Sequence, residues 1–468
     1  DKEQRVVLGK EPTCVATGVA HDYCKACGND LGNETVVPAL GHDFQNGKCT
    51  RCPATEPVSE EKKHTLTLNA GEGTIGNEKT ATRDIYEGQP IPSLPDASLG
   101  GTTFVGWYLE DGDITVNATE TSQIVSQGGT SKPDSNPIIS TRAPGSSETG
   151  ATNNTVTITA EKNATANVTL ENVNIDTRTR GEAAITTSGE GNVNIELDGT
   201  NTVQSGNTHA GVEKKDNGTL TITDENKDGS LKATGGDGGA GIGGGASYNG
   251  SNIEISSGEV TAIGGNFGAG IGGGQAGSGS NITIEGGKVK AQGGWSGAGI
   301  GGGGSGSGNN ITISDGEVTA KGGTFGAGIG GGGDGGGGNN ITIDGGMVTA
   351  QGGKNGAGIG GGLRSNGSGI TISGDAQVKA QGGADWNSIK KGAAIGNGGT
   401  PSQEGDEQTF DPSKLTVDGF IQTYEPGKNI NTDSPDKTIE GQKGDHFWNA
   451  GEVTTPATCT APWVRTYT

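Results

Sequence analysis

The chain has 468 residues, of which 94 are glycine, far above the usual share of about 7%. Only 28% are hydrophobic and 4% aromatic, which argues against one large conventional core and leaves disorder or a repeat architecture. The formal net charge of −22 argues against nucleic acid and anionic membranes as partners. No apolar run approaches the roughly 20 residues of a membrane span, so we expect no membrane insertion.

Two C-x2-C pairs stand near the N-terminus, Cys24 with Cys27 and Cys49 with Cys52. Four thiolates in two such knuckles can bind zinc tetrahedrally and hold together a module too small for its own core. Two disulfides are the alternative that an exported chain favours. We therefore predict a Cys-rich module over residues 1–58 that contains either a zinc ion or disulfides.

A further cysteine, Cys14, has its counterpart at the other end of the chain. The segment ATCTAPWVRTYT around Cys459 repeats features of PTCVATGVAHDY around Cys14. Residues 444–468 are therefore predicted to begin a second Cys-rich module, and we expect the chain to be part of a longer protein. The pattern resembles the cysteine-knuckle repeats of large surface proteins of anaerobic, gut-type Gram-positive bacteria. That resemblance implies secretion or attachment to the cell wall.

Residues 62–126 are predicted to form a second small module. The run HTLTLNAGEGTIG from His64 alternates as a strand and turn do. The segment ends in GTTFVGWYLEDG at residues 101–112. Together these features resemble the internalin B-repeat family, which implies a β-grasp-like fold. The polar stretch from residue 127 is typical of a linker.

The phrase GAGIGGG occurs five times, and its central isoleucines recur every 29 or 30 residues. They are Ile242, Ile271, Ile300, Ile329 and Ile359. Each repeat also contains two isoleucines two residues apart (N-I-x-I in four of the five), a three-residue turn and a second short strand with Val and Ala two residues apart. The apolar positions alternate with period 2. One repeat cannot bury such strands, but repeats stacked in parallel bury those of their neighbours.

We therefore predict an all-β fold whose main domain, residues 134–443, is a parallel β-helix with rungs of about 29 residues. Parallel connections favour the right hand. Degenerate phrases extend the series to rungs at 185, 212 and 395, and residues 400–443 are expected to cap it. The asparagines that open the N-I-x-I runs predict an amide ladder along the axis. They are Asn252, Asn281, Asn310 and Asn340.

The glycine phrase is predicted to form the third side of each rung. In this arrangement Ala240 and Ile242 point inward, while Gly241 and Gly243 point outward and leave a strip without side chains. The next two glycines are expected to turn the corner with positive φ.

Aromatic residues precede the phrase in successive repeats, namely Phe267, Trp295 and Phe325, and Trp386 follows further on. Beside a bare glycine strip they would suit a sugar chain, whose apolar faces pack on aromatic rings. The alternative is that these rings only cover the hydrophobic end of each rung.

Two aspartates, Asp315 and Asp344, lie in turns one rung apart and are candidate calcium ligands. Solvated turn residues are the alternative for both. We expect no organic cofactor.

Catalysis on a β-helix needs convergent acids, or a base with a cation, and the carboxylates of these repeats occupy different columns. We therefore expect no enzyme activity, with a polysaccharide lyase or glycoside hydrolase as the alternative. The block from Val168 resembles β-helical domains described as carbohydrate-binding in bacterial surface proteins. This resemblance implies a polysaccharide or host glycan as partner, sometimes with calcium. The prediction is a non-catalytic adhesin, monomeric within a longer chain, and a structural stalk is the second possibility.

Overall fold

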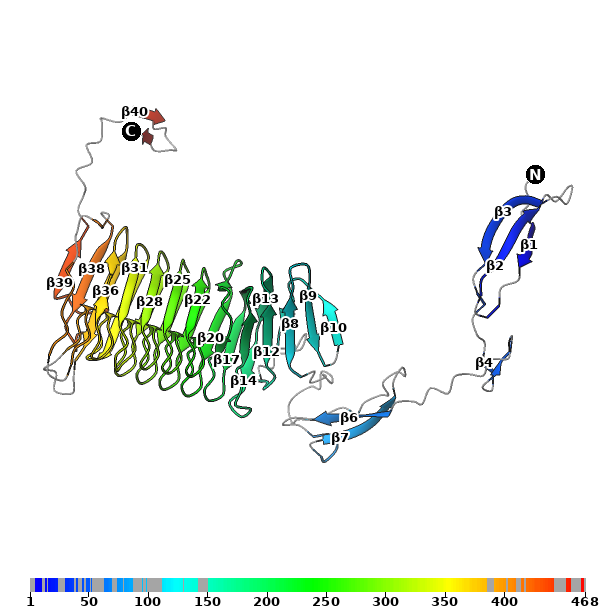
Figure 1. The fold of residues 1–468 in the computed structure, drawn as a ribbon, viewed down its shortest axis with the longest axis horizontal. Helices are drawn as coiled ribbons and strands as arrows, with labels where there is room; N and C mark the ends of the chain where they lie inside the picture. Colours follow the sequence, from blue (N-terminus) through cyan, green and yellow to red (C-terminus); the bar gives the residue numbers. More distant parts are fainter. Residues whose placement is uncertain are drawn as a thin grey trace. The chain divides into compact units, whose positions relative to one another are not determined.

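The computed structural model of the chain divides into two compact units, residues 1–108 and 109–468 (Figure 1). The structure describes residues 5–10, 13–14, 16–23, 30–37, 39–40, 44–45, 48–50, 52, 63–69, 74–78, 80–86, 95, 98, 112–128, 130–141, 150–384, 391–400, 403–409, 414–415, 418–441, 452–455 and 464–466. None of these residues forms a helix long and apolar enough to cross a membrane.

The described residues of the first unit form three small antiparallel sheets. Their strands are β1 (Arg5–Lys10), β2 (Gly18–Tyr23) and β3 (Asp30–Val37), then β4 (Phe44–Gln45) and β5 (Lys48–Cys49), then β6 (Lys63–Asn69) and β7 (Thr80–Tyr86). The strand predicted at His64 is confirmed by β6. Residues 101–111, which carry most of the resemblance to the internalin B-repeat, lie outside the described residues.

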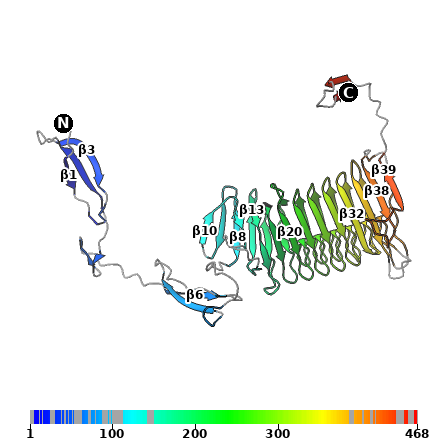
Figure 2. The ribbon, with the colours of Figure 1, turned by 180° about the vertical axis from the view of Figure 1, so that it is seen from behind.

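The second unit is built on three long sheets, whose strands succeed one another along the axis in Figures 1 and 2. We call them the glycine, asparagine and valine sheets. In spatial order the glycine sheet contains β10 (Thr130–Pro133), β9 (Gln123–Gln127), β8 (Ile114–Ala118), β12 (Val156–Ala160), β15 (Ile185–Gly189), β18 (Val212–Lys214), β21 (Ile242–Gly243), β24 (Ile271–Gly272), β27 (Ile300–Gly301), β30 (Ile329–Gly330), β33 (Ile359–Gly360) and β37 (Ile395–Gly396).

The asparagine sheet contains β11 (Ile138–Ile139), β13 (Thr165–Glu171), β16 (Asn192–Asp198), β19 (Leu220–Thr223), β22 (Gly250–Ile255), β25 (Gly279–Ile284), β28 (Gly308–Ile313), β31 (Gly338–Ile343), β34 (Gly367–Ser368) and β35 (Thr371–Ile372). The valine sheet contains β14 (Asn174–Asp176), β17 (Thr200–Gln204), β20 (Ser230–Thr234), β23 (Glu259–Ile263), β26 (Lys288–Gln292), β29 (Glu317–Lys321), β32 (Met347–Lys354), β36 (Gln377–Gly383), β38 (Phe420–Tyr424) and β39 (Lys437–Glu440). A separate hairpin joins β40 (Glu452–Thr455) to β41 (Val464–Thr466).

The predicted fold class, a parallel β-helix, is confirmed by the register of the strands. Ile242 pairs with Ile271, and the same column runs through Ile300, Ile329 and Ile359 to the next rung. In the valine sheet Val260 pairs with Val289 in the same way. These side chains are completely buried. The core therefore consists of columns one residue wide, in which each side chain packs on its counterparts in the neighbouring rungs. This explains how a chain with so few hydrophobic residues can form a buried core.

The β-helix begins earlier than the sequence predicted. Strand β8 pairs in parallel with β12, Ile114 opposite Val156, and its residues Val116 and Ala118 are buried in the common core. Residues 114–126 therefore belong to the glycine sheet, not to the separate module predicted over 62–126, and the predicted start at 134 is too late. Strands β9 and β10 fold back antiparallel at this end of the sheet.

The C-terminal end of the β-helix is closed within the segment that we predicted to cap it, residues 400–443. Strand β38 continues the valine sheet in parallel, and β39 then pairs with it antiparallel. Leu415 and Ile421 of this segment are buried in the common core. Val417 of the same segment lies outside the described residues.

The predicted asparagine ladder is present on the asparagine sheet. The Asn281 amide donates to Asn252 Oδ1 (2.9 Å), Asn310 donates to Asn281 (3.1 Å), and Asn340 donates to Asn310 (3.2 Å). All four residues have left-handed backbones, with φ between 52° and 56°. In the following rung Gly369 takes this place with φ 65°. Asparagine tolerates this conformation better than most residues. The asparagines therefore meet the need for a left-handed backbone at this position as well as forming the ladder.

We expect Asn310→Ala to destabilise the chain by about 1 kcal/mol more than Asn310→Gly. Both variants lose two exposed amide hydrogen bonds, each worth about 0.5–1.5 kcal/mol. Alanine must also adopt a left-handed φ, which costs roughly 1–2 kcal/mol and which glycine avoids. Midpoints of denaturant unfolding measured by circular dichroism check this order, and equal midpoints for the two variants would contradict it.

Candidate functional site

The glycine phrase is buried rather than bare. All seven residues of each GAGIGGG phrase are buried, and Ala240 and Ile242 are fully so, as predicted. The predicted outward strip is wrong, however, because the backbone of the next rung fills that space. A Cβ at Gly241 would lie 2.5 Å from the backbone nitrogen of Ile263 and 2.6 Å from the carbonyl oxygen of Gly270. No open glycine strip is therefore available for a ligand.

The corner of each rung is turned by the glycine that directly follows the isoleucine. Gly272 has φ +131°, and the equivalent glycines have φ between 129° and 137°. L side chains rarely adopt this conformation. The prediction that assigned positive φ to the next two glycines is therefore wrong by one position.

The candidate site lies on the turns that lead into these buried phrases. Trp295 is 51% exposed, and its ring packs edge-to-face on that of Phe325, with centroids 5.8 Å apart and an interplanar angle of 81°. Phe267 and Phe325 are partly buried. We call Phe267, Trp295 and Phe325 the aromatic ridge. Among the described residues, Trp295 and Phe325 are the only two aromatic rings that pack against each other.

The three aromatic residues do not share one column, although each stands just before a glycine phrase in the sequence. A Cβ built on Gly294 would contact the carbonyl of Gly265, so these two glycines occupy the same position in neighbouring rungs. In that register Trp295 corresponds to Asn266, and Ser296 corresponds to Phe267. The offset is visible when GGNFGAG, GGWSGAG and GGTFGAG are aligned without gaps, because Trp295 is the third residue of its segment, whereas Phe267 and Phe325 are the fourth of theirs. The offset allows the Trp295 ring to lie beside Phe325 instead of stacking on Phe267.

A second set of turns, which follow the phrases, borders the aromatic ridge. The amide of Gly333 donates to the carbonyl of Ser296 (2.7 Å), and that of Leu363 donates to the carbonyl of Phe325 (2.9 Å). The next residues, Asp334 and Arg364, form an exposed ion pair at 3.8 Å. We call these two residues the charged turn. No sequence pattern marks Asp334 and Arg364, because they stand in the variable part of the repeat.

The remaining predicted site residues are not brought together. Trp386 lies outside the described residues. Asp315 and Asp344 are both exposed, and they occupy different positions of their turns. The amide of Asp344 donates to the Ile313 carbonyl, which is the place that Ser314 takes one rung earlier. The carboxylate of Asp315 accepts a hydrogen bond from its neighbour Gly316 (2.7 Å), as turn residues do.

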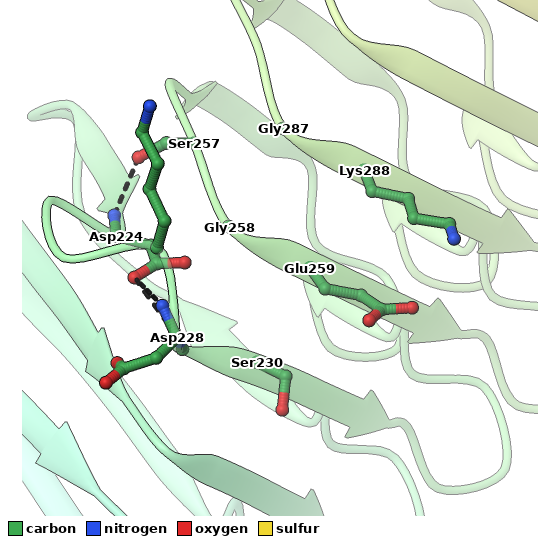
Figure 3. A pocket seen from close by; sticks show the side chains of 10 residues that line it. Asp224, Asp228, Ser230, Ser257, Gly258, Glu259, Gly287 and Lys288 are labelled. Atoms are coloured by element: carbon green, nitrogen blue, oxygen red, sulfur yellow. Dashed lines mark hydrogen bonds between the residues drawn. The ribbon is translucent and has the colours of Figure 1, made fainter.

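Two shallow hollows lie elsewhere on the β-helix. The larger, about 460 Å³, is bounded by the 224–230 loop and the turns before β23 and β26 (Figure 3). Its buried Asp224 accepts hydrogen bonds from the amides of Asp228 (3.2 Å) and Gly229 (3.1 Å), so its carboxylate holds its own loop together. The smaller, about 370 Å³, lies over the asparagine sheet, where Asn194 donates to Asn167 (2.9 Å). Neither has an aromatic side chain in its lining.

The structure places a cysteine outside the predicted set, Cys14, beside two cysteines of that set. Cys49 and Cys52 lie next to Cys14, whereas Cys24 and Cys27 lie outside the described residues. A hydrogen bond with Cys52, burial and the neighbouring Cys49 raise the pKa of the Cys14 thiol to about 12. Within the described part of the chain this is the only group of three or more potential metal ligands.

Comparison with known proteins supports the architecture. A family model described as a β-helix repeat matches residues 253–275, 282–304, 311–333 and 341–363. Each match begins at the first isoleucine of an N-I-x-I run and ends in the turn after a GAGIGGG phrase. No curated protein and no solved structure matches the chain. These four segments of the chain are therefore β-helix repeats.

Proposed function

We propose that this chain is a non-catalytic, secreted or cell-surface adhesin that binds carbohydrate at the aromatic ridge. The observation that carries the proposal is Trp295, a large apolar ring that is half exposed and braced by Phe325. A ring held in this way presents its apolar surface to a ligand without losing much conformational freedom, and the apolar faces of sugars pack on such rings.

The charged turn supports the choice of a polar ligand. Asp334 and Arg364 are exposed and adjoin the turns that carry Trp295 and Phe325. A carboxylate accepts hydrogen bonds from sugar hydroxyls, and a guanidinium donates them. Ligand sites commonly combine an apolar surface with a few convergent polar groups, which fix the orientation of the ligand.

A glycan array probed with the full chain tests the proposal. We expect Trp295→Ala to weaken binding about tenfold, because a well-packed aromatic contact contributes about 1–1.5 kcal/mol. Tyr248→Ala is the matched control, since Tyr248 is 61% exposed on a turn of another rung. Equal affinity of the Trp295 variant and the wild type would remove the ridge from the site.

The second candidate is a structural stalk that projects another domain of a longer chain. The continuous pairing of the glycine sheet from β8 to β37 favours it, because stacked rungs of this kind form a long, laterally supported rod. The array separates the two functions, since a stalk would bind no glycan. Release of reducing ends from acidic polysaccharides would show that the third possibility, an enzyme, holds instead.

A further inference from the structure

Three sulfur atoms of the first unit lie close together. The Sγ atoms of Cys14, Cys49 and Cys52 are all within 4.8 Å of one another. Those of Cys14 and Cys49 are 3.7 Å apart, much longer than the about 2.05 Å of a disulfide bond. The distance matches two corners of a tetrahedron whose centre is about 2.3 Å from each sulfur, the usual zinc–sulfur distance.

The backbone brings these cysteines together from two distant segments. Cys49 ends β5, which pairs with β4, and Cys52 follows it at C-x2-C spacing. Cys14 lies in a turn that is closed by a hydrogen bond from the Thr13 amide to the Ala16 carbonyl (2.9 Å). The amide of Leu40 also donates to the Thr13 carbonyl (2.9 Å), which ties this turn to the chain just before β4.

The surroundings of the three thiols favour a metal over simple packing. Cys14 and Cys49 are 6% and 8% exposed, and Leu68 is the only other buried hydrophobic residue among those whose side chains are described in the first unit. A module of fewer than roughly 60 residues buries little apolar surface and usually needs a cross-link such as a metal ion for stability. Thiols are weak hydrogen-bond partners for one another, whereas thiolates bind soft metal ions such as zinc strongly.

We propose that Cys14, Cys49 and Cys52 together bind one Zn²⁺ ion. Each thiol releases its proton to solvent and forms one sulfur–zinc bond, and no group changes its oxidation state. Structural zinc sites hold four ligands, so at most one of Cys24 and Cys27 joins this site. The ligand set therefore differs from the pair of knuckles that the spacing alone predicted, because Cys14 replaces at least one cysteine of the first knuckle.

Metal analysis of the full chain, purified with zinc under reducing conditions, tests the site. We expect one zinc per chain in the wild type and an affinity at least about tenfold weaker in Cys14→Ser, since even outer-shell changes at metal sites cost 10–100-fold. Cys459→Ser, the matched control, should keep its zinc. Cys14→His supplies a nitrogen ligand in place of the thiolate and should recover zinc binding. Such recovery would show that Cys14→Ser loses zinc because a ligand is missing and not because the chain fails to fold.

Two results would overturn the proposal. One is a Cys14→Ser chain that binds zinc like the wild type while Cys24→Ser and Cys27→Ser both lose it. The other is a wild-type chain without zinc, or with a Cys14–Cys49 disulfide in non-reducing mass spectrometry.

Discussion

Gly303→Ala should destabilise the β-helix by about 3 kcal/mol or more, whereas Gly304→Ala should leave its stability within about 0.5 kcal/mol of the wild type or raise it slightly. A Cβ at Gly303 would lie 1.9 Å from the carbonyl oxygen of Gly274 in the preceding rung. At Gly304 the nearest atoms belong to the side chains of Phe267 and Ser296, at 3.4 and 3.5 Å. The two neighbouring glycines thus differ only in what surrounds them.

The large effect follows from the stacking of the rungs. The clash at Gly303 is with backbone, which cannot move without separating two rungs and breaking their hydrogen bonds. At Gly304 an added methyl group meets ordinary van der Waals contacts, and alanine lowers the entropy of the unfolded chain. Midpoints and slopes of guanidinium unfolding, followed by circular dichroism, measure both variants. A Gly303 variant as stable as Gly304→Ala would show that successive rungs are not in contact at this column.

The features that the sequence predicted correctly are those that repeat as single residues. The isoleucine column from Ile242 to Ile359, the valine column and the asparagine ladder all follow from the spacing of 29 or 30 residues. The early rung at β8 was missed, although ITVNA at residues 114–118 has the same alternation as VTITA at residues 156–160. No glycine phrase marks that rung in the sequence, so only its strand pairing with β12 identifies it as part of the β-helix.

Features that depend on contacts between rungs could not be predicted in the same way. Whether Gly241 faces solvent or the backbone near Ile263 depends on how closely the next rung approaches. The neighbourhood of Trp295 and the charged turn depends likewise on hydrogen bonds between two loops, such as that from Gly333 to Ser296. The Cys14 group combines segments 35 residues apart, and Cys14 has no C-x2-C partner that would have marked it as a ligand.

A buried ion pair was also hidden in the sequence. In the run VEKKDNG at residues 212–218 the side chains of Lys214 and Asp216 are only 1% and 2% exposed, and their Nζ and Oδ1 atoms form an ion pair. Lys214 also donates to the carbonyl of Asp216 (3.1 Å). The second carboxylate oxygen of Asp216 is buried without a hydrogen-bond partner. Loss of either residue is therefore expected to destabilise the fold, because the remaining buried charge would have no counter-charge.

We therefore expect Lys214→Met to destabilise the chain by about 3–5 kcal/mol, since it leaves the Asp216 carboxylate buried without a counter-charge. The double variant Lys214→Met with Asp216→Leu should recover most of this loss, because two apolar side chains need no partner in the interior. Lys290→Met is the matched control. Lys290 and Glu259 form a pair at 3.2 Å in which both side chains are 50% exposed, and such pairs contribute at most about 1 kcal/mol.

A double-mutant cycle built on unfolding midpoints isolates the energy of this pair. A coupling energy of about 2 kcal/mol or more is expected between Lys214 and Asp216, because when either residue is replaced the remaining charge has no access to water. If Lys214→Met and Lys290→Met lowered stability equally, the two pairs would be equally solvated, and the ion pair could not lie in the interior. In the rungs of the glycine sheet from Ile242 to Ile359, Gly243 and its equivalents take the place of Glu213, and a second glycine takes the place of Lys214, so these rungs carry no charge at the two positions after the isoleucine.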